Sequence, residues 1–426
     1  MIGSVAFGSL FTLLALGIPI FVALGIVSLL LFAGDGAPLV DAALVIMEGL
    51  DSPAFVAVPF FVIAAAFMEK GGIIRVMIDA AHSWVGRAPG GLALVCVFAT
   101  TIFAAISGSS VATALAMGTL LVPAMTARHY DRSFALGVVG ASGTVGILIP
   151  PSLAMILYGI IADESVPRLF LAGVVPGLLQ TAILALWILY YAKRKGFQAE
   201  AVSSRESRLK ANLRVLPALL IPAAIFVGIY GGITTVSEAA AVATLLAMII
   251  AIFVYREVRV GEIPAIFAGG IKSAGAITFI LASALLFSHW ITQSGVPARL
   301  VEMMLAHDLK PWQFLLLINA LMIIFGMFFD AIAVVLIVVP LTLGAVQAFG
   351  IDMIHYGVIV TVNIELAMLT PPMGLNLFVL SSISKAPFTE VSRGVLPFIG
   401  LMIVLLALVT FIPALSTWLP NLVYGR

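Results

Sequence analysis

Two pairs of adjacent prolines, Pro150-Pro151 and Pro371-Pro372, lie in the middle of strongly apolar stretches. Proline has no amide hydrogen and its ring clashes with the carbonyl four residues earlier, so each pair must interrupt a helix. In a lipid bilayer an interrupted helix is tolerated only where its freed backbone groups face protein, water or a ligand. The two pairs therefore predict two discontinuous helices whose exposed carbonyls and helix ends could hold an ion or a substrate.

The composition is that of a membrane protein. Hydrophobic residues make up 62% of the 426 residues and charged residues only 10%, whereas a typical soluble domain has about half and a quarter. Nearly uncharged stretches long enough to span a bilayer follow one another along the chain. We therefore expect an all-α polytopic membrane protein, and nothing resembles a nucleic-acid-binding surface. The apolar start is expected to be a retained helix, either one long helix or two short ones kinked at Pro19.

A hydrophilic segment at residues 193–214 divides the chain. It is rich in Lys and Arg, which predicts a cytoplasmic location. Residues 1–192 and 215–426 are then expected to be repeats. A shift of 221 residues superposes the two proline pairs, and it also places Gly173 on Gly394 and Pro176 on Pro397.

Two apolar segments, at about 91–126 and 312–349, are far longer than the roughly 20 residues that a spanning helix needs. Each has a small or polar centre, at Ser107–Ser110 in the first and at Gly326–Asp330 in the second. Two half-helices that meet at a tip fit this pattern better than one long tilted helix. We expect two re-entrant helical hairpins.

The remaining apolar segments predict the topology. Discontinuous helices are expected at about 133–161 and 355–383, with further crossings at 168–192, 213–232, 237–256, 264–293 and 394–418. An odd number of crossings then separates the two hairpins, so the second repeat is inverted relative to the first. All Lys and Arg fall on the cytoplasmic side except those at positions 168, 299, 310 and 426. Inverted repeats with broken helices are typical of secondary transporters.

The first hairpin tip offers three hydroxyls, a glycine and the N-terminus of a following half-helix. Hard cations such as Na⁺ take several oxygen ligands, which hydroxyls and carbonyls supply. The break at residues 143–152 would add more carbonyls. A close contact between helices through small residues is the alternative interpretation of this tip.

The second half repeats this pattern with a carboxylate. Asp330 lies in an apolar segment, where an unpaired charge is costly and function is the default interpretation; an Asp at a helix end near the membrane surface is the alternative. Residues 363–376 combine Thr370, the proline break, Gly374 and Asn376 into an oxygen-rich stretch. Glu365 could be a ligand or a structural hydrogen-bond acceptor, and the structural role is favoured.

These residues resemble the large membrane subunit (DctM or SiaM type) of TRAP transporters, the tripartite ATP-independent periplasmic family. The resemblance covers nearly the whole chain. Ala345 and Ala367 depart from it, because the family often has proline and glycine there, which bears on local helix geometry. The stretches that carry the resemblance are Pro59–Phe61 with Gly71-Gly72, Phe103–Ser110, Ile149–Ser152, Leu169–Gly177, Gly231–Ala241 and Thr370–Asn376.

The resemblance implies an elevator mechanism, in which a transport domain holding both hairpins and both discontinuous helices slides against a scaffold. It implies a sodium site between each tip and its break, with substrate between the two tips. The sodium-binding residues would be Ser107, Gly108, Ser109, Gly146, Pro150, Ser152, Gly326, Asp330, Thr370, Pro371, Gly374 and Asn376. The substrate-binding residues would be Ser109, Ser110, Asp330, Ala331 and Asn376.

The resemblance also implies partners. These are a small four-helix membrane subunit as a separate chain and a periplasmic substrate-binding protein, in a bacterial inner membrane. The substrate would be a carboxylate anion, such as a C4-dicarboxylate, a sialic acid or a related sugar or keto acid. Sodium is the expected coupling ion, and we expect no organic cofactor and no enzymatic activity.

Three alternatives remain open at this point. The nearest is a sodium-coupled carboxylate carrier that works without a binding protein. An intramembrane hydrolase using Ser107 or Asp330 would need a base that no motif provides. The third alternative is a passive channel.

Overall fold

The computed structural model describes residues 8–10, 12–13, 16–36, 38–197 and 205–425. Over these residues the chain is helical and has no strand, which confirms the all-α prediction. The helices before the hydrophilic segment are α2 (Ile20–Gly34), α3 (Leu39–Leu50), α4 (Ala57–Lys70), α5 (Ile73–Val85), α6 (Gly91–Ser107), α7 (Ser110–Thr126), α8 (Arg132–Leu148), α9 (Leu153–Ala162) and α10 (Val166–Lys195).

The second half begins with α11, so the hydrophilic segment at 193–214 is helical at both of its ends. Lys193, Arg194 and Lys195 form the last turn of α10, where positive side chains interact favourably with the helix dipole. The helices of this half are α11 (Arg205–Tyr230), α12 (Val236–Ile249), η1 (Ile250–Val254), η2 (Val260–Glu262), α13 (Ile263–Gln293), α14 (Val296–Ala306), α15 (Pro311–Gly326), α16 (Ala331–Ala348), α17 (Met353–Leu369), α18 (Leu375–Ser384), α19 (Phe388–Phe411) and α20 (Ala414–Tyr424).

Helices of the two halves occur at matching positions. Both α8 and α17 have 17 residues, and their first residues, Arg132 and Met353, are 221 positions apart. The caps match as well: Asp131 and Asp352 each accept a hydrogen bond from a backbone amide in the first turn. The repeat in the sequence therefore has a counterpart in the helix boundaries.

Seven helical segments among the described residues are long and apolar enough to cross a membrane. Six coincide with predicted crossings. The predicted discontinuous helix at 355–383 consists of two shorter helices, α17 and α18, as expected. The segment Ala331–Ala348 is also long and apolar enough to cross, although we expected it in a hairpin. The re-entrant geometry of the hairpins stays a prediction.

Proline also shapes the start of the chain. The helix α2 begins directly after Pro19, and Gly17 just before it has a positive φ of 79°, as expected for two short pieces and not one long helix. Residues 1–7, 11 and 14–15 lie outside the described part.

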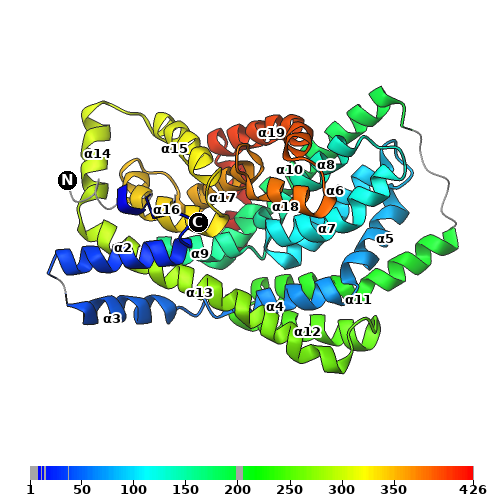
Figure 1. Ribbon diagram of the computed structural model, residues 1–426, viewed down its shortest axis with the longest axis horizontal. Helices are drawn as coiled ribbons and strands as arrows, with labels where there is room; N and C mark the ends of the chain where they lie inside the picture. The colour runs from blue at the N-terminus through cyan, green and yellow to red at the C-terminus, as the bar shows by residue number, and fades with distance from the viewer. Residues whose placement is uncertain (1–7, 11, 14–15, 37, 198–204, 426) are drawn as a thin grey trace.

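The two discontinuous helices form the centre of the molecule. Every residue of α8 from Phe134 and every residue of α17 from Ile354 is buried. Around them pack α6, α7, α9, α10, α15, α16, α18 and α19. A second group, which includes α3, α4, α12 and α13, runs along one edge of the molecule (Figure 1).

Glycines set the distance between α8 and α19. A Cβ atom on Gly394 would lie 2.0 Å from the carbonyl oxygen of Ser133, and one on Gly137 would lie 2.1 Å from the carbonyl oxygen of Gly394. Only glycine at both positions permits this close approach, which joins the first broken helix to a helix of the other half.

Candidate functional site: a cavity between two helix breaks

The first proline pair ends one helix and permits another. The helix α8 stops at Leu148 and α9 starts at Leu153. Ser152 caps α9, because its hydroxyl accepts a hydrogen bond of 3.3 Å from the amide of Met155. The break between them, including Pro150, is buried, so its carbonyls face the protein interior.

The first tip is a two-residue connection between α6 and α7. Gly108 has a φ of +59°, which lies in the left-handed region that glycine adopts more easily than any other residue. Ser109 caps α7 by accepting from the amide of Ala112 at 3.4 Å. Thr113 donates to the carbonyl of Ser109 at 2.7 Å, and its hydroxyl lies 2.8 Å from that of Ser107.

The tip lies against the break. A Cβ atom on Gly108 would be 2.8 Å from the carbonyl oxygen of Pro151. One on Gly146 would be 3.0 Å from the Thr113 hydroxyl and 3.4 Å from the Ser109 carbonyl. Oxygens of the tip thus lie against the break and an oxygen of the break lies against the tip. They include the hydroxyl of Thr113, which we did not assign from the sequence. The sequence signal for Thr113 is its position four residues after Ser109, which places its hydroxyl one helical turn from the tip.

The second tip and break have the same plan with different chemistry. Asp330 caps α16 by accepting from the amide of Ala333 at 3.2 Å, as Ser109 does for α7. Gly326 packs against Ala367, since a Cβ on the glycine would lie 2.5 Å from that of Ala367. Three residues later the Thr370 hydroxyl donates to the carbonyl of Leu366 at 2.6 Å.

The second break differs from the first in exposure. Thr370 and Pro371 are partly exposed, and Pro372 and Met373 are exposed, whereas Gly374 is buried. The amide of Gly374 donates to the carbonyl of Thr370 at 3.2 Å. The duplicated proline breaks therefore sit in unequal surroundings.

A cavity of about 100 Å³ lies between the two tips and the two breaks. The first residues of α7, α9, α16 and α18, which are Ser110, Leu153, Ala331 and Leu375, all line it. Four helix N-termini thus meet at one space. The other lining residues are Gly108, Ser109, Val111, Ile147, Ala154, Asp330, Ile332 and Met368.

One hydrogen bond beside this cavity joins the two halves directly. The side-chain amide of Asn376, on α18, donates to the hydroxyl of Ser110 at the start of α7. Both residues are buried, and the carbonyl oxygen of the Asn376 side chain has no hydrogen-bond partner. Asn376 was predicted for the second cation site, but its donor is directed to the first tip.

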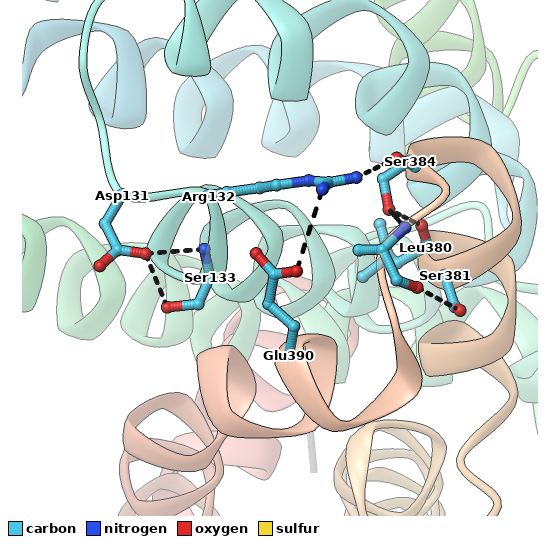
Figure 2. Close-up of polar contacts among 8 residues, drawn as sticks. Asp131, Arg132, Ser133, Leu380, Ser381, Ser384 and Glu390 are labelled. Atoms are coloured by element: carbon cyan, nitrogen blue, oxygen red, sulfur yellow. Dashed lines mark hydrogen bonds and ion pairs between the residues drawn. The ribbon is translucent and has the colours of Figure 1, made fainter.

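A second link between the halves lies at one end of the broken helices (Figure 2). Arg132, the first residue of α8, donates to the carbonyl of Ser384 at the end of α18. Its guanidinium is also 3.9 Å from the carboxylate of Glu390 in the first turn of α19. These contacts join α8 to α18 and α19, and the hydrogen bond to Ser384 is the closer of the two.

A comparison with known protein families identifies the family of this chain. The family model described as the DctM component of the tripartite ATP-independent periplasmic transporter matches residues 7–415. This chain belongs to the DctM family. The relatives described below are named as transporter permeases and not as enzymes, and the chain is a multi-pass membrane protein.

Three relatives of this DctM-family chain have different named substrates. A C4-dicarboxylate large permease of Pseudomonas aeruginosa is 40% identical over 93% of this chain and 92% of its own length. A sialic acid large permease of Vibrio cholerae is 33% identical over 100% of this chain and 99% of its own length. An isethionate permease protein, DctMQ, of Oleidesulfovibrio alaskensis is 36% identical over 96% of this chain and 65% of its own length.

Two solved membrane transporters share the fold at low identity. The YdaH transporter of Alcanivorax borkumensis gives a TM-score of 0.61 at 12% identity, covering 85% of this chain and 86% of its own. MtrF of Neisseria gonorrhoeae gives a TM-score of 0.61 at 11% identity, covering 88% of this chain and 83% of its own. The DctM-family chain therefore has a transporter fold.

Proposed function

We propose that this chain imports a carboxylate anion across the bacterial inner membrane, coupled to Na⁺ and supplied by a periplasmic binding protein. The observation that carries the proposal is the cavity where the N-termini of α7, α9, α16 and α18 meet. Helix N-termini carry partial positive charge and unpaired amides, so they favour an anion. Broken helices of secondary transporters use their ends in this way.

The carboxylate of Asp330 supports coupling to a cation. It lines the same cavity, where it would repel a bound anion at short range. A cation held between the second tip and the Thr370 break would offset that repulsion. Bound Na⁺ would then make anion binding more favourable, and the anion would do the same for Na⁺.

The first cation would be held where the first tip meets its break. The Thr113 hydroxyl donates to the Ser109 carbonyl and both lie against Gly146 of the break, while the Pro151 carbonyl lies against Gly108 of the tip. Such oxygens suit a hard cation. Of the predicted residues, Ser107, Gly108 and Gly146 shape this site, while Pro150 and Ser152 form the adjoining break.

The mechanism we propose is of the elevator type. The buried group around α8 and α17 would move as a transport domain against the outer group that contains α4, α12 and α13. The small membrane subunit would be a separate chain that joins this scaffold. Residues 193–214 would face the cytoplasm.

The size of the cavity favours a small substrate. Pockets for drug-sized ligands usually measure about 300–1,000 Å³, whereas this cavity measures about 100 Å³. The permeases from Pseudomonas aeruginosa and Vibrio cholerae are named for a C4-dicarboxylate and a sialic acid. We expect C4-dicarboxylates to compete for uptake better than sialic acids do.

Reconstitution in vesicles tests the proposal. The chain, with its small subunit and binding protein, should take up a labelled C4-dicarboxylate only with an inward Na⁺ gradient. Replacing Ser109 with Ala should raise the Na⁺ concentration needed for half-maximal uptake by about fivefold, because loss of the hydroxyl cap (about 1 kcal/mol) loosens the tip that carries the candidate carbonyl ligand.

Thr119→Ala is the matched control, because Thr119 lies on the same helix and its hydroxyl only bonds the carbonyl of Leu115. Uptake by the chain without the binding protein would favour the rival carrier, and flux without Na⁺ dependence would favour a channel. Either result would contradict the proposal.

A further inference from the structure

A small polar cluster lies in the centre of the buried helices, apart from the cavity. Glu365 on α17 and Thr144 on α8 are each 0% exposed, and Gln180 on α10 is 1% exposed. Among the residues that the structure describes, Glu365 is the only buried Asp or Glu. The side chain of Gln180 and the backbone of Leu148 approach the carboxyl group of Glu365, but neither meets hydrogen-bond geometry with its two oxygens.

A count of donors shows what this cluster lacks. The side-chain amide of Gln180 donates to the Thr144 hydroxyl at 3.0 Å and to the sulfur of Met402 at 3.2 Å, so both of its hydrogens are used. The Thr144 hydroxyl donates to the carbonyl of Ala141 at 2.9 Å. The remaining side-chain atoms, Oε1 of Gln180 and both oxygens of Glu365, are buried acceptors without a donor.

The cluster lies where the two repeats meet. The sequence shift of 221 that aligns the proline pairs also aligns Thr144 with Glu365, and Gln180 and Met402, which touch, are 222 positions apart. Thr144 and Glu365 are therefore equivalent positions, whereas the equivalent of Gln180 is Leu401, the neighbour of Met402. Glu365 is the one acidic side chain among these positions, so its carboxyl group has no counterpart across the repeat.

We propose that Glu365 is a proton-binding site, in which the neutral acid donates a hydrogen bond to Oε1 of Gln180. An ionised carboxylate only accepts hydrogen bonds, whereas the protonated form supplies one donor. A proton is also the only ligand that needs no additional space among packed side chains. It converts two buried acceptors without partners into one hydrogen-bonded pair.

Charged side chains do not offer an alternative partner within the described residues. The titratable groups on helices packed against α17 lie elsewhere along those helices, and the polar groups facing Glu365 are those of Gln180 and Leu148. These groups are Arg132 on α8, Tyr158 on α9, Arg168, Tyr190, Tyr191, Lys193, Arg194 and Lys195 on α10, Glu390 and Arg393 on α19, Tyr424 on α20, and His355 and Tyr356 on α17.

Infrared spectroscopy of the purified full-length chain in lipid nanodiscs tests this proposal without measuring transport. We expect a carboxylic-acid carbonyl band that persists over the neutral pH range and shifts when glutamate is labelled with ¹³C. The band should be absent in Glu365→Gln. In Gln180→Leu it should move, because the acid loses its acceptor, whereas in Glu390→Gln it should be unchanged.

Thermal unfolding gives an independent measurement. If Glu365 is neutral in the folded chain and ionised once unfolding exposes it to water, folding takes up a proton, and stability falls as the pH rises. This slope should be smaller in Glu365→Gln. An unshifted spectrum on labelling, or the same pH slope in both proteins, would overturn the proposal and would assign Glu365 as an ionised group.

Discussion

At the scale of single residues, the two hairpin tips are built alike but differ in charge. Ser109 and Asp330 are 221 positions apart, and each caps the half-helix that follows it. A neutral hydroxyl stands in one repeat where a carboxylate stands in the other. The two candidate cation sites therefore have the same backbone plan, while only the second has a formal negative charge.

Gly108 should be intolerant of any side chain. Its φ of +59° costs an L-residue about 1–2 kcal/mol, and a Cβ would also press on the carbonyl of Pro151. We expect Gly108→Ala to lower the melting temperature and to raise the Na⁺ requirement for uptake. Gly275→Ala is the control, because nothing lies within 4 Å of its Cβ position; equal effects of the two would exclude a special role for the tip.

At the scale of helices, the close crossing of α8 and α19 holds the first broken helix in place. Because each glycine at this crossing faces backbone of the other helix, no side-chain rotation can relieve an added methyl group. The helices would have to move apart, which disturbs every contact along α8.

Gly394→Ala should therefore destabilise the chain by about 1–3 kcal/mol, the usual cost of overpacking. Gly400→Ala, on the same helix with nothing within 4 Å, should be neutral or slightly stabilising. Thermal unfolding of the two purified variants in detergent makes the comparison. A Gly394 variant as stable as the Gly400 variant would show that the crossing adapts.

The breaks and tips could be predicted from the sequence because their causes are local. Proline at 150 and 371 cannot continue a helix, and glycine and serine at 108 and 109 favour a turn followed by a cap. The bond from Asn376 to Ser110 could not be predicted, since it joins residues 266 positions apart. The lack of a hydrogen-bond partner for Glu365 likewise could not be predicted, because it depends on how α8, α10 and α17 pack. The side-chain amide of Gln180 donates to Thr144 and Met402 and not to Glu365.

At the scale of the whole molecule, a pocket of about 220 Å³ separates the two groups of helices near one end. It is lined by Lys70 and Arg75 on one side and by Leu115 and Thr119 of α7 on the other. Around Arg75 the contacts are weak, because its ion pair with Glu257 is 3.9 Å long and well exposed. This boundary is therefore a suitable place to test relative motion.

A reversible cross-link across this pocket should stop transport. We expect a cysteine pair at Lys70 and Thr119, joined by a short thiol-reactive linker, to abolish Na⁺-driven uptake and to recover it when the linker is cleaved. Each single cysteine treated in the same way is the control, and the buried Cys96 should not react. Full uptake with the linker in place would argue against a sliding transport domain.

The unequal exposure of the two proline breaks has a consequence for timing. In the proposed mechanism, a cation at the buried Pro150 break would wait for neighbouring helices to separate, whereas one at the break beside the exposed Met373 would exchange more readily. Two ions that entered equivalent halves would then depart in sequence, the one nearer Thr370 first. Rapid dilution of Na⁺ should accordingly give a fast and a slow phase, and Thr370→Ala should remove the fast one.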